Sequence, residues 1–287
     1  MRTVLLTAPV LLALVACTGP AGNGNGKNDV DTDGDGLTDA EEADYGTNPD
    51  SPDSDGDGLD DYDEINTYGT DPNSEDGDGD GYLDVWEINE GTDPNDAESR
   101  IYVGNWPYQP DKDQFGDVAW SDAEPKRSSQ LPRFQYIDQW GDTVDVYDFA
   151  GHGKPVVIDI SAEWCPPCQG IAAWLSGTSD PYGFGNSYPN VPDAIANGDV
   201  YWITVMGEKN NGELPTENTL RKWYEAYPDE HIPVLGDDGN CAPTYVTTGW
   251  PTLFMLNDDM TVYKPSFDNY QKTLQEIQDI YELNNGG

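Results

Sequence analysis

Residues 164–168 read Trp-Cys-Pro-Pro-Cys and follow closely on an apolar run at residues 156–160. Two cysteines separated by two residues can close a small disulfide and open it again. A strand that leads such a pair into a helix places the first sulfur at a helix N-terminus. The free N–H groups and partial positive charge there favour the thiolate over the thiol. The spacing therefore predicts a redox-active pair, Cys165 and Cys168.

A zinc site is the alternative interpretation, because a Cys-x-x-Cys pair also binds metal. A structural zinc ion needs two further ligands. The chain offers Cys241, His152 and His231, and none of them forms a second closely spaced pair. The redox interpretation is therefore favoured, and Cys241 is expected to be a small buried apolar residue.

Three acidic loops begin at residues 31, 53 and 76. Each places carboxylates at positions one, three, five, nine and twelve and glycine at position six. Calcium takes about six to eight oxygen ligands, and this spacing wraps them around one ion, with a backbone carbonyl at position seven. Without calcium, the same segment reads as a disordered acidic linker. The predicted ligands are Asp31, Asp33, Asp35, Leu37, Asp39 and Glu42, then Asp53, Asp55, Asp57, Leu59, Asp61 and Glu64, then Asp76, Asp78, Asp80, Tyr82, Asp84 and Glu87.

The intervals between the loops contain Gly-Thr-x-Pro, which leaves no room for the paired long helices of an EF-hand. The array resembles bacterial thrombospondin type 3 repeats. This resemblance implies a stalk with little regular structure and little hydrophobic core, wound around calcium. Neighbouring repeats of that family can share ions, so the number of calcium ions stays open.

The formal net charge is −42, and residues 29–98 contain no Lys or Arg. Such a charge excludes nucleic acid as a partner, because nucleic-acid binding needs a basic surface. It favours cations instead.

The N-terminus reads Met1-Arg2, then an apolar stretch at residues 4–16, then Cys17. This pattern predicts a secretory signal, and the stretch is short for a membrane span. Residues 14–17 resemble the bacterial lipoprotein box, which implies cleavage before Cys17 and lipidation of its side chain. Thr18 favours the outer membrane by the same resemblance. An ordinary signal peptide is the alternative, and either implies a compartment that permits disulfides.

Composition divides the chain into five regions. Residues 1–16 are a lipoprotein signal peptide, 17–28 a lipidated cysteine and flexible tether, and 29–99 the calcium-binding repeats. Residues 100–130 form a connecting segment, and 131–287 a globular domain, called the redox domain below. The redox domain is expected to stay folded and active without calcium, because it has its own core.

Within the redox domain, apolar and β-branched runs predict strands at residues 134–137, 144–147, 156–160, 200–205 and 252–256, with a weaker one at 261–263. Helices are predicted after Cys165, at 217–227 and at 269–283. Strands that alternate with helices indicate an α/β fold.

Residues 157–168 resemble the active-site strand and turn of thioredoxin, and residues 241–253 resemble its later segment, which ends in the cis-proline strand. The segments at 132–137, 141–144 and 153–158 resemble the exported, membrane-tethered thiol-disulfide reductases of TlpA/ResA type. The resemblance implies a thioredoxin-like fold with a central mixed sheet flanked by helices.

The resemblance also implies roles. Cys165 would be the exposed nucleophile, next to Trp164 of the active-site motif, and Cys168 the buried resolving thiol, with a disulfide between them in the oxidised state. Asp159 would be a buried carboxylate that takes the proton of Cys168. Pro251 would be the cis-proline. Trp250 precedes Pro251 and departs from the family, which usually has a smaller residue at this position.

The function expected is therefore a lipid-anchored thiol-disulfide oxidoreductase that uses the Cys-Pro-Pro-Cys pair and acts as a reductase, displayed on a calcium-stabilised stalk. Its expected place is the bacterial cell envelope, on the outer membrane and facing the periplasm or the cell surface. Its partners would be disulfide-containing or dithiol proteins and an upstream electron donor, and its cofactor calcium. A structural or adhesive calcium-binding lipoprotein is the alternative. Such a protein would be expected to carry a damaged redox motif, and this motif is intact. A peroxidase is disfavoured, because no Pro-x-x-x-Thr-x-x-Cys loop is present.

Overall fold

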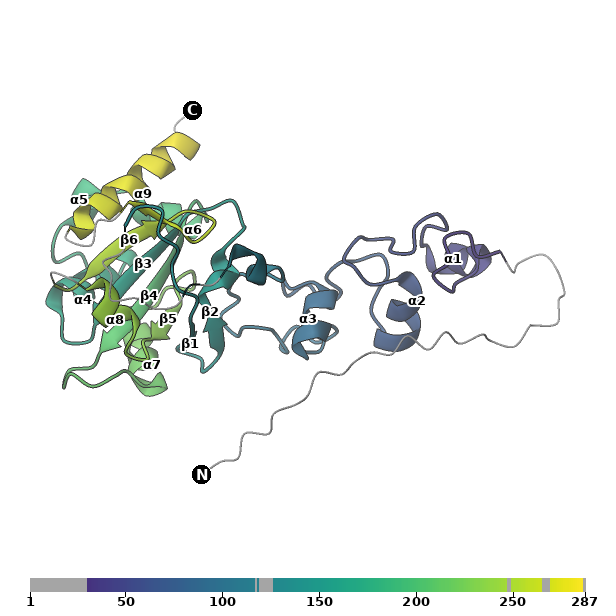
Figure 1. Cartoon of the computed structure of the whole chain (residues 1–287), viewed down its shortest axis with the longest axis horizontal. Helices are drawn as coiled ribbons and strands as arrows, with labels where there is room; N and C mark the ends of the chain where they lie inside the picture. The colour runs from purple at the N-terminus through teal and green to yellow at the C-terminus, as the bar shows by residue number, and fades with distance from the viewer. Residues whose placement is uncertain (1–29, 117, 119–125, 247–248, 265–268, 286–287) are drawn as a thin grey trace, which may run out of the picture. The chain divides into compact units, whose positions relative to one another are not determined.

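The computed structural model of the chain describes residues 30–116, 118, 126–246, 249–264 and 269–285 (Figure 1). Two compact units divide between Asn73 and Ser74. The first unit contains the first two acidic loops. The second unit contains the third loop together with the whole described part of the redox domain. The predicted signal peptide and Cys17 lie outside the described residues.

Each acidic loop leads into a short helix. These are α1 (Asp39–Tyr45), α2 (Asp61–Asp63), which continues as a π-helical turn (Glu64–Tyr68), and α3 (Asp84–Glu90). All three end at a left-handed glycine, namely Gly46, Gly69 or Gly91, with φ between 76° and 86°. A residue without Cβ adopts this conformation at no steric cost. The Gly-Thr-x-Pro motif is therefore the helix stop of each repeat.

The central sheet of the second unit has the strand order β5-β4-β3-β6-β7 (Figure 1). Strand β3 (Val156–Ala162) pairs in parallel with β4 (Tyr201–Glu208), which pairs in parallel with β5 (Val234–Gly236). On its other side β3 pairs antiparallel with β6 (Thr252–Leu256), which pairs antiparallel with β7 (Val262–Lys264). All seven residues of β3 are buried, as a central strand covered on both faces must be.

A separate hairpin joins β1 (Gln135–Ile137) to β2 (Thr143–Asp145). The prediction of strand at 144–147 was wrong beyond Asp145. The Asp145 carboxylate accepts a hydrogen bond from the Tyr147 N–H (2.9 Å), which turns the chain into a 3₁₀ helix, η3 (Val146–Phe149). Strand β5 was not predicted, because three residues are too few to show a period.

Helices cover both faces of the sheet. Val156, Ile158 and Ile160 of β3 face the hairpin and α8 (Cys241–Tyr245). Val157 faces α4 (Pro166–Leu175), α6 (Val191–Ala196) and α9 (Tyr270–Asn285). Alternation along a strand puts Asp159 on the same face as Val157, toward α4. The helices are η2 (Lys112–Phe115), α4 (Pro166–Leu175), α5 (Phe184–Ser187), α6 (Val191–Ala196), α7 (Glu217–Ala226), α8 (Cys241–Tyr245) and α9 (Tyr270–Asn285).

This is the thioredoxin-like arrangement that the sequence predicts: a mixed sheet flanked by helices, with the cysteine pair between the central strand and the helix that follows it. Among the residues described, no helix combines the length and the apolar character that crossing a membrane requires.

Candidate functional site

The two cysteines of the motif form a disulfide at the start of α4. Cys165 is the N-cap of this helix, and its sulfur accepts a hydrogen bond from the Cys168 N–H at 3.2 Å. Pro166 and Pro167 occupy the first helical positions, where an N–H has no partner within the helix in any case. The sequence thus places one sulfur directly at the positive end of a helix.

Both sulfurs are buried, which corrects the expectation that Cys165 is exposed. Cys165 is 2% exposed and Cys168 is fully buried in this disulfide form. They share a cluster with Met206 of β4 and with Trp223 of α7, and Trp250 packs against the same cluster. These covering side chains come from distant segments, so their effect on Cys165 is not visible in the motif itself.

Two tryptophans border the disulfide. Trp164 is 43% exposed, and its Nε1–H donates to Glu208 Oε2 at 3.0 Å. Its ring meets that of Trp250 edge to face, with 6.1 Å between the centroids. The peptide bond between Trp250 and Pro251 is cis, and Pro251 precedes β6 directly. A Cβ on Gly207 would lie 2.5 Å from the Trp250 ring, so this ring needs glycine beneath it.

A groove of about 280 Å³ adjoins Trp250. Its walls are formed by Glu208, Leu214, Ala242, Pro243 and Val246, among others. The lining is mixed, because Glu208 and Asp237 contribute to it beside these apolar side chains.

Asp159 lies on the β3 face that carries α4, and it is 3% exposed. Its carboxylate accepts hydrogen bonds from Ser161 Oγ (2.9 Å) and Thr204 Oγ1 (3.4 Å). Burial raises the pKa of Asp159 to about 7, although these hydrogen bonds pull it the other way. A carboxyl group with this pKa can take up and release a proton at neutral pH.

A cavity of about 20 Å³ connects Asp159 to the helix of the disulfide. Ala172 of α4 lines it together with Asp159 and Thr204. Cys168 precedes Ala172 by four residues, so the two lie on the same face of α4. The space is of the size that one water molecule needs. Asp159 therefore lies on the Cys168 side of the sheet.

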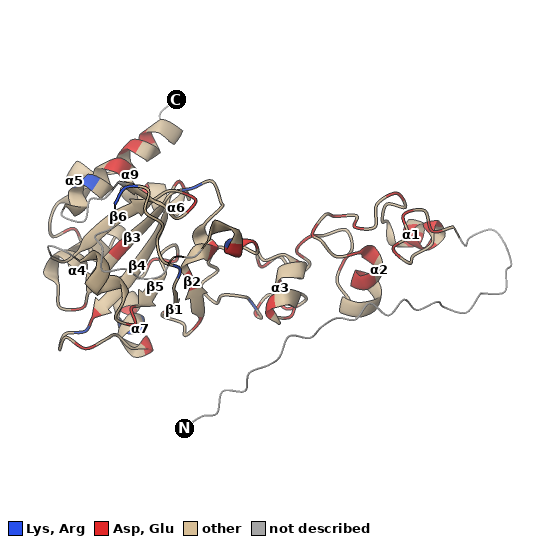
Figure 2. Cartoon of the chain, viewed as in Figure 1, with Lys and Arg blue, Asp and Glu red and all other residues tan. Residues whose placement is uncertain are grey.

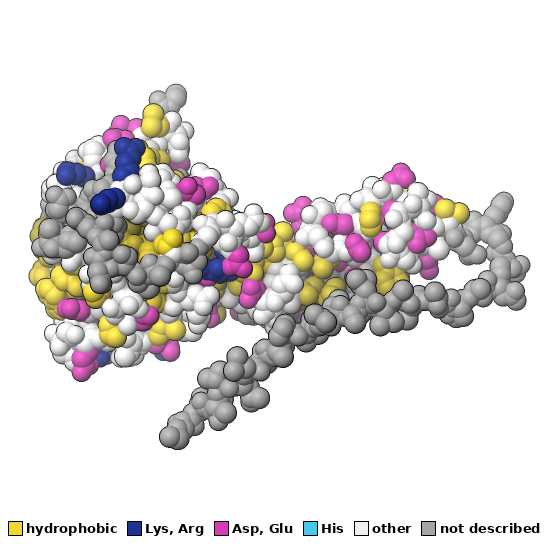
Figure 3. All heavy atoms as spheres, viewed as in Figure 1, with side chains coloured by type: hydrophobic (Ala, Val, Ile, Leu, Met, Phe, Trp, Pro, Cys, Tyr) yellow, Lys and Arg dark blue, Asp and Glu magenta, His cyan; other side chains and the backbone are white. Residues whose placement is uncertain are grey.

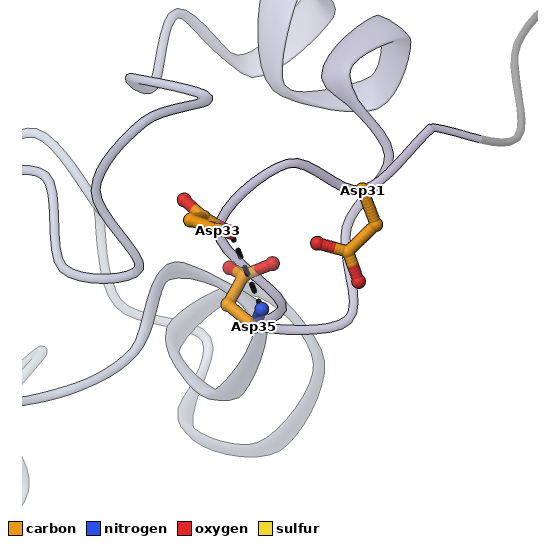
Figure 4. Close-up of side chains that lie close together, drawn as sticks. All are labelled: Asp31, Asp33 and Asp35. Atoms are coloured by element: carbon orange, nitrogen blue, oxygen red, sulfur yellow. Dashed lines mark hydrogen bonds between the residues drawn. The ribbon is translucent and has the colours of Figure 1, made fainter.

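The three acidic loops share one local geometry. Carboxylate oxygens from positions one, three and five lie within 4.8 Å of one another in each loop: Asp31, Asp33 and Asp35; Asp53, Asp55 and Asp57; Asp76, Asp78 and Asp80. Figure 4 shows the first set facing a common space inside its loop. Backbone N–H groups hold the carboxylates, as where Gly34 donates to Asp31 (2.7 Å) and Leu37 to Asp35 (2.7 Å). Equivalent bonds recur in the other two loops.

The position-twelve glutamates lie in the helical turns that follow the loops, outside the three carboxylate clusters. Glu42, Glu64 and Glu87 are all fully buried. Burial raises their pKa values to about 7, about 8 and about 7, and neighbouring aspartates of the same loop add to the rise. Carboxylates packed so closely repel one another unless a cation joins them.

The predicted ligands at loop positions seven and nine lie outside the three carboxylate clusters. The side chains of Leu37, Leu59 and Tyr82 are buried, so position seven can offer only its carbonyl. At position nine, Asp39 accepts hydrogen bonds from the N–H and hydroxyl of Thr32 (both 3.0 Å), and Asp61 accepts the same pair from Ser54. These aspartates do not belong to the three carboxylate clusters, and Asp84 follows the pattern by accepting from Gly77.

Calcium fits these loops. In the part of the chain that the structure describes, Oδ2 of Asp33, Asp55 and Asp78 is buried without a hydrogen-bond partner, once per loop at position three. A buried oxygen of this kind is costly unless a cation coordinates it. The oxygen-only donor set suits a hard divalent ion. Figures 2 and 3 show acidic residues along the repeats and in the rest of the chain, whereas the Lys and Arg residues of the described part lie after the repeats.

Zinc does not fit the cysteine pair, because both sulfurs are engaged in the disulfide. Cys241 is a free, fully buried thiol in α8, and burial raises its pKa well above the ordinary value. Within the described ranges, groups that could hold a metal ion gather in the three acidic loops.

Sequence reasoning missed Ser161, Thr204, Gly207 and Glu208. Ser161 and Thr204 hold the Asp159 carboxylate, and Thr204 does so because the β3–β4 register places it opposite Asp159. No local pattern reveals that register.

Residues 31–52, 53–75 and 76–97 match the bacterial TSP3 repeat family. The chain thus carries three consecutive TSP3 repeats, a calcium-binding type of repeat. No curated protein sequence matches the chain.

Solved structures similar to this chain include a thioredoxin-like protein from Bacteroides caccae (TM-score 0.40, 16% identity), with 54% of this chain covering half of that one. Another is the exposed lipoprotein thioredoxin of Streptococcus pneumoniae (TM-score 0.35, 25% identity, 50% of this chain and 98% of that one). A third is described as a thiol:disulfide interchange protein DsbE from Chlorobium tepidum (TM-score 0.36, 18% identity, 54% and 99%).

Proposed function

We propose that this protein is a thiol-disulfide oxidoreductase of the bacterial cell envelope that works as a reductase. One observation carries the proposal: the Cys165–Cys168 disulfide caps helix α4. The cis-proline segment and the buried Asp159 on the α4 side of the sheet support it. Calcium held by the repeats would have a structural role, and lipid on Cys17 would anchor the chain to the membrane.

The reaction starts from the dithiol form. The Cys165 thiolate attacks one sulfur of a partner disulfide, which breaks the partner's S–S bond and forms a mixed disulfide. The partner's second sulfur leaves as a thiolate and takes a proton. The Cys168 thiolate then attacks the Cys165 sulfur and releases the partner's first sulfur. Two electrons pass to the partner, and the chain is left as the disulfide seen here.

Asp159 would accept the proton of Cys168 in the second step. Its pKa of about 7 lets it do so near neutral pH. Solvent can exchange this proton through the small cavity, which Asp229 also lines.

The partners would be proteins with accessible disulfides. The groove beside Trp250 would take their chain, and Glu208 at its edge disfavours acidic segments there. A separate dithiol donor must return the pair to its reduced form after each turnover.

A redox titration of Cys165 and Cys168, together with insulin reduction, tests the proposal. We expect a potential well below about −180 mV and turnover of insulin disulfides with dithiothreitol as donor. A potential near about −120 mV would make the protein an oxidant instead. A pair that does not exchange with insulin or with a thiol buffer would leave only a structural or adhesive lipoprotein.

Asp159→Asn is expected to stabilise the oxidised protein above neutral pH. The folded-state pKa of Asp159, about 7, lies above its ordinary value of 3.8, so ionisation disfavours the folded state as pH rises from about 4 to 7 and adds no further cost above. Three pKa units correspond to about 4 kcal/mol as an upper estimate. Urea unfolding of variant and parent at several pH values measures the difference, with the exposed Asp193→Asn as control.

The same variant should slow release of the partner by about a hundredfold, because the Cys168 thiol loses its base. Single-turnover rates measured across pH report on partner release alone, apart from the effect of the variant on stability. If parent and Asp159→Asn share one pH profile, Asp159 has no part in proton transfer.

A further inference from the structure

The third repeat differs from the first two at loop position seven. The first two carry Leu37 and Leu59, and the third carries Tyr82, which is 2% exposed. Tyr82 belongs to the hydrophobic core that contains Val156 and Ile158 of strand β3. Its hydroxyl donates to the backbone oxygen of Trp106 at 2.7 Å. A residue of a calcium loop is therefore part of the core of the redox domain.

Trp106 continues this connection to the β1–β2 hairpin. It is 4% exposed, and its Nε1–H donates to Asp138 Oδ2 at 2.8 Å. The other oxygen of Asp138 accepts the backbone N–H groups of Trp140 (2.8 Å), Gly141 (2.9 Å) and Asp142 (3.0 Å), which form the hairpin turn. Next to it, Gln139 Oε1 accepts the N–H of Val234 in β5. Calcium loop, hairpin and central sheet are thus joined through buried polar contacts.

A second connection runs from helix α3. The Trp86 ring packs on Tyr108 with 5.6 Å between centroids, and the Tyr108 hydroxyl donates to Glu90. Lys112 lies over the Tyr108 ring and pairs with the buried Asp148 of η3. Arg100 also lies 3.6 Å from the loop carboxylate of Asp80. The segment from Arg100 to Lys112 is therefore held by ion pairs at both ends, with Asp80 of the third loop and with Asp148 of η3.

We propose that the calcium site of the third repeat is a structural metal site of the redox domain, whereas the first two sites stabilise a separate unit. The boundary between Asn73 and Ser74 divides the repeats in this way. The function is new for this site, since the repeat pattern assigns all three loops alike.

The physical reason is linkage. An ion that binds the folded state alone stabilises everything that unfolds together with its site. The third loop shares a core with the sheet, so its bound calcium would raise the stability of the whole second unit. Without calcium, the carboxylates of Asp76, Asp78 and Asp80, whose oxygens lie within 4.8 Å of one another, repel each other and lower that stability.

Tryptophan fluorescence offers a selective readout. All nine tryptophans lie between Trp86 and Trp250, and residues 1–73 contain none. Thermal unfolding of the full, oxidised chain followed by this signal therefore reports on the second unit. We expect calcium at about a hundred times its Kd to raise the Tm by about 5–10 °C relative to chelator. An unchanged Tm would overturn the proposal without any variant.

Two matched variants assign the effect to one site. Glu87→Gln and Glu64→Gln remove the same carboxylate, at position twelve, from the third and the second loop, and both residues are fully buried. Glu64→Gln should keep the calcium-dependent rise in Tm, and Glu87→Gln should lose most of it. Equal rises in the two variants, or loss in Glu64→Gln alone, would contradict the proposal.

A third variant tests the connection itself. Tyr82→Leu restores the residue type of the first two loops and keeps the backbone carbonyl. It should reduce the rise in Tm while calcium still binds, as measured by calorimetry. A full rise in Tyr82→Leu would show that the core contact does not transmit the stabilisation. These readouts are stabilities, so they stand whether or not the protein reduces disulfides.

Discussion

The Cys165→Ser protein is expected to reduce no insulin above the uncatalysed background, whereas Cys168→Ser should form mixed disulfides that accumulate. Cys165 caps α4, where its sulfur accepts the Cys168 N–H, and it is expected to make the first attack. Cys168 lies inside the first turn of α4, and it is expected to make the second attack, on the Cys165 sulfur. Mass spectrometry of the trapped species, with insulin chains as partner, measures the difference.

Cys241→Ala is the matched control, because it removes a thiol that is buried in α8 and bonded to no other cysteine. Its activity should equal that of the parent. Turnover by Cys165→Ser, or mixed disulfides that form through Cys165 and Cys168 equally, would contradict the assignment of the nucleophile.

Removal of calcium is expected to unfold the first unit. Within residues 30–73, all of them described, the buried apolar side chains are Leu37, Leu59 and Pro72, while Glu42, Asp61 and Glu64 are buried carboxylic acids. So small an apolar core cannot offset the entropy of ordering this segment, and calcium binding must supply the remaining free energy. Limited proteolysis in chelator should cut the first unit rapidly and leave the second largely intact.

Protection should return at calcium concentrations of about 10⁻⁴ to 10⁻³ M, the range of extracellular calcium modules. Magnesium serves as the control cation, since its strict octahedral geometry suits these loops poorly. Equal cleavage of residues 30–73 with and without calcium would mean that the two repeats are a plain acidic linker.

The elements nearest the redox site could be predicted because their signals are local. The apolar run of β3 and the Pro-Pro between the cysteines set the strand, the turn and the start of α4. The Trp250–Pro251 bond is cis, as the resemblance to thioredoxin implies. The carboxylate clusters of the acidic loops could also be predicted, because alternate aspartates within five residues come together by local geometry alone.

Contacts between distant segments could not be predicted. No local pattern near Tyr82 indicates that its hydroxyl donates a hydrogen bond to the backbone oxygen of Trp106. The sequence analysis therefore assigned the third repeat to the stalk together with the first two. The expectation that the redox domain stays folded and active without calcium was based on its own core, and it stays a prediction. Likewise, Cys165 is buried by Met206 and Trp250, which the fold brings from other strands and loops.

Pro166 and Pro167 have a consequence for the direction of electron flow. Neither proline has an N–H, so the N-terminal end of α4 offers few backbone donors to a thiolate at Cys165. The Cys168 N–H, 3.2 Å from the Cys165 sulfur, is the donor that remains. Stabilising the thiolate is what makes a dithiol reluctant to give up electrons, as in strong oxidants. A dithiol whose thiolate is less stabilised is a stronger reductant. In the reductase proposed above, the two residues between the cysteines would thereby favour donation to a partner over withdrawal from it.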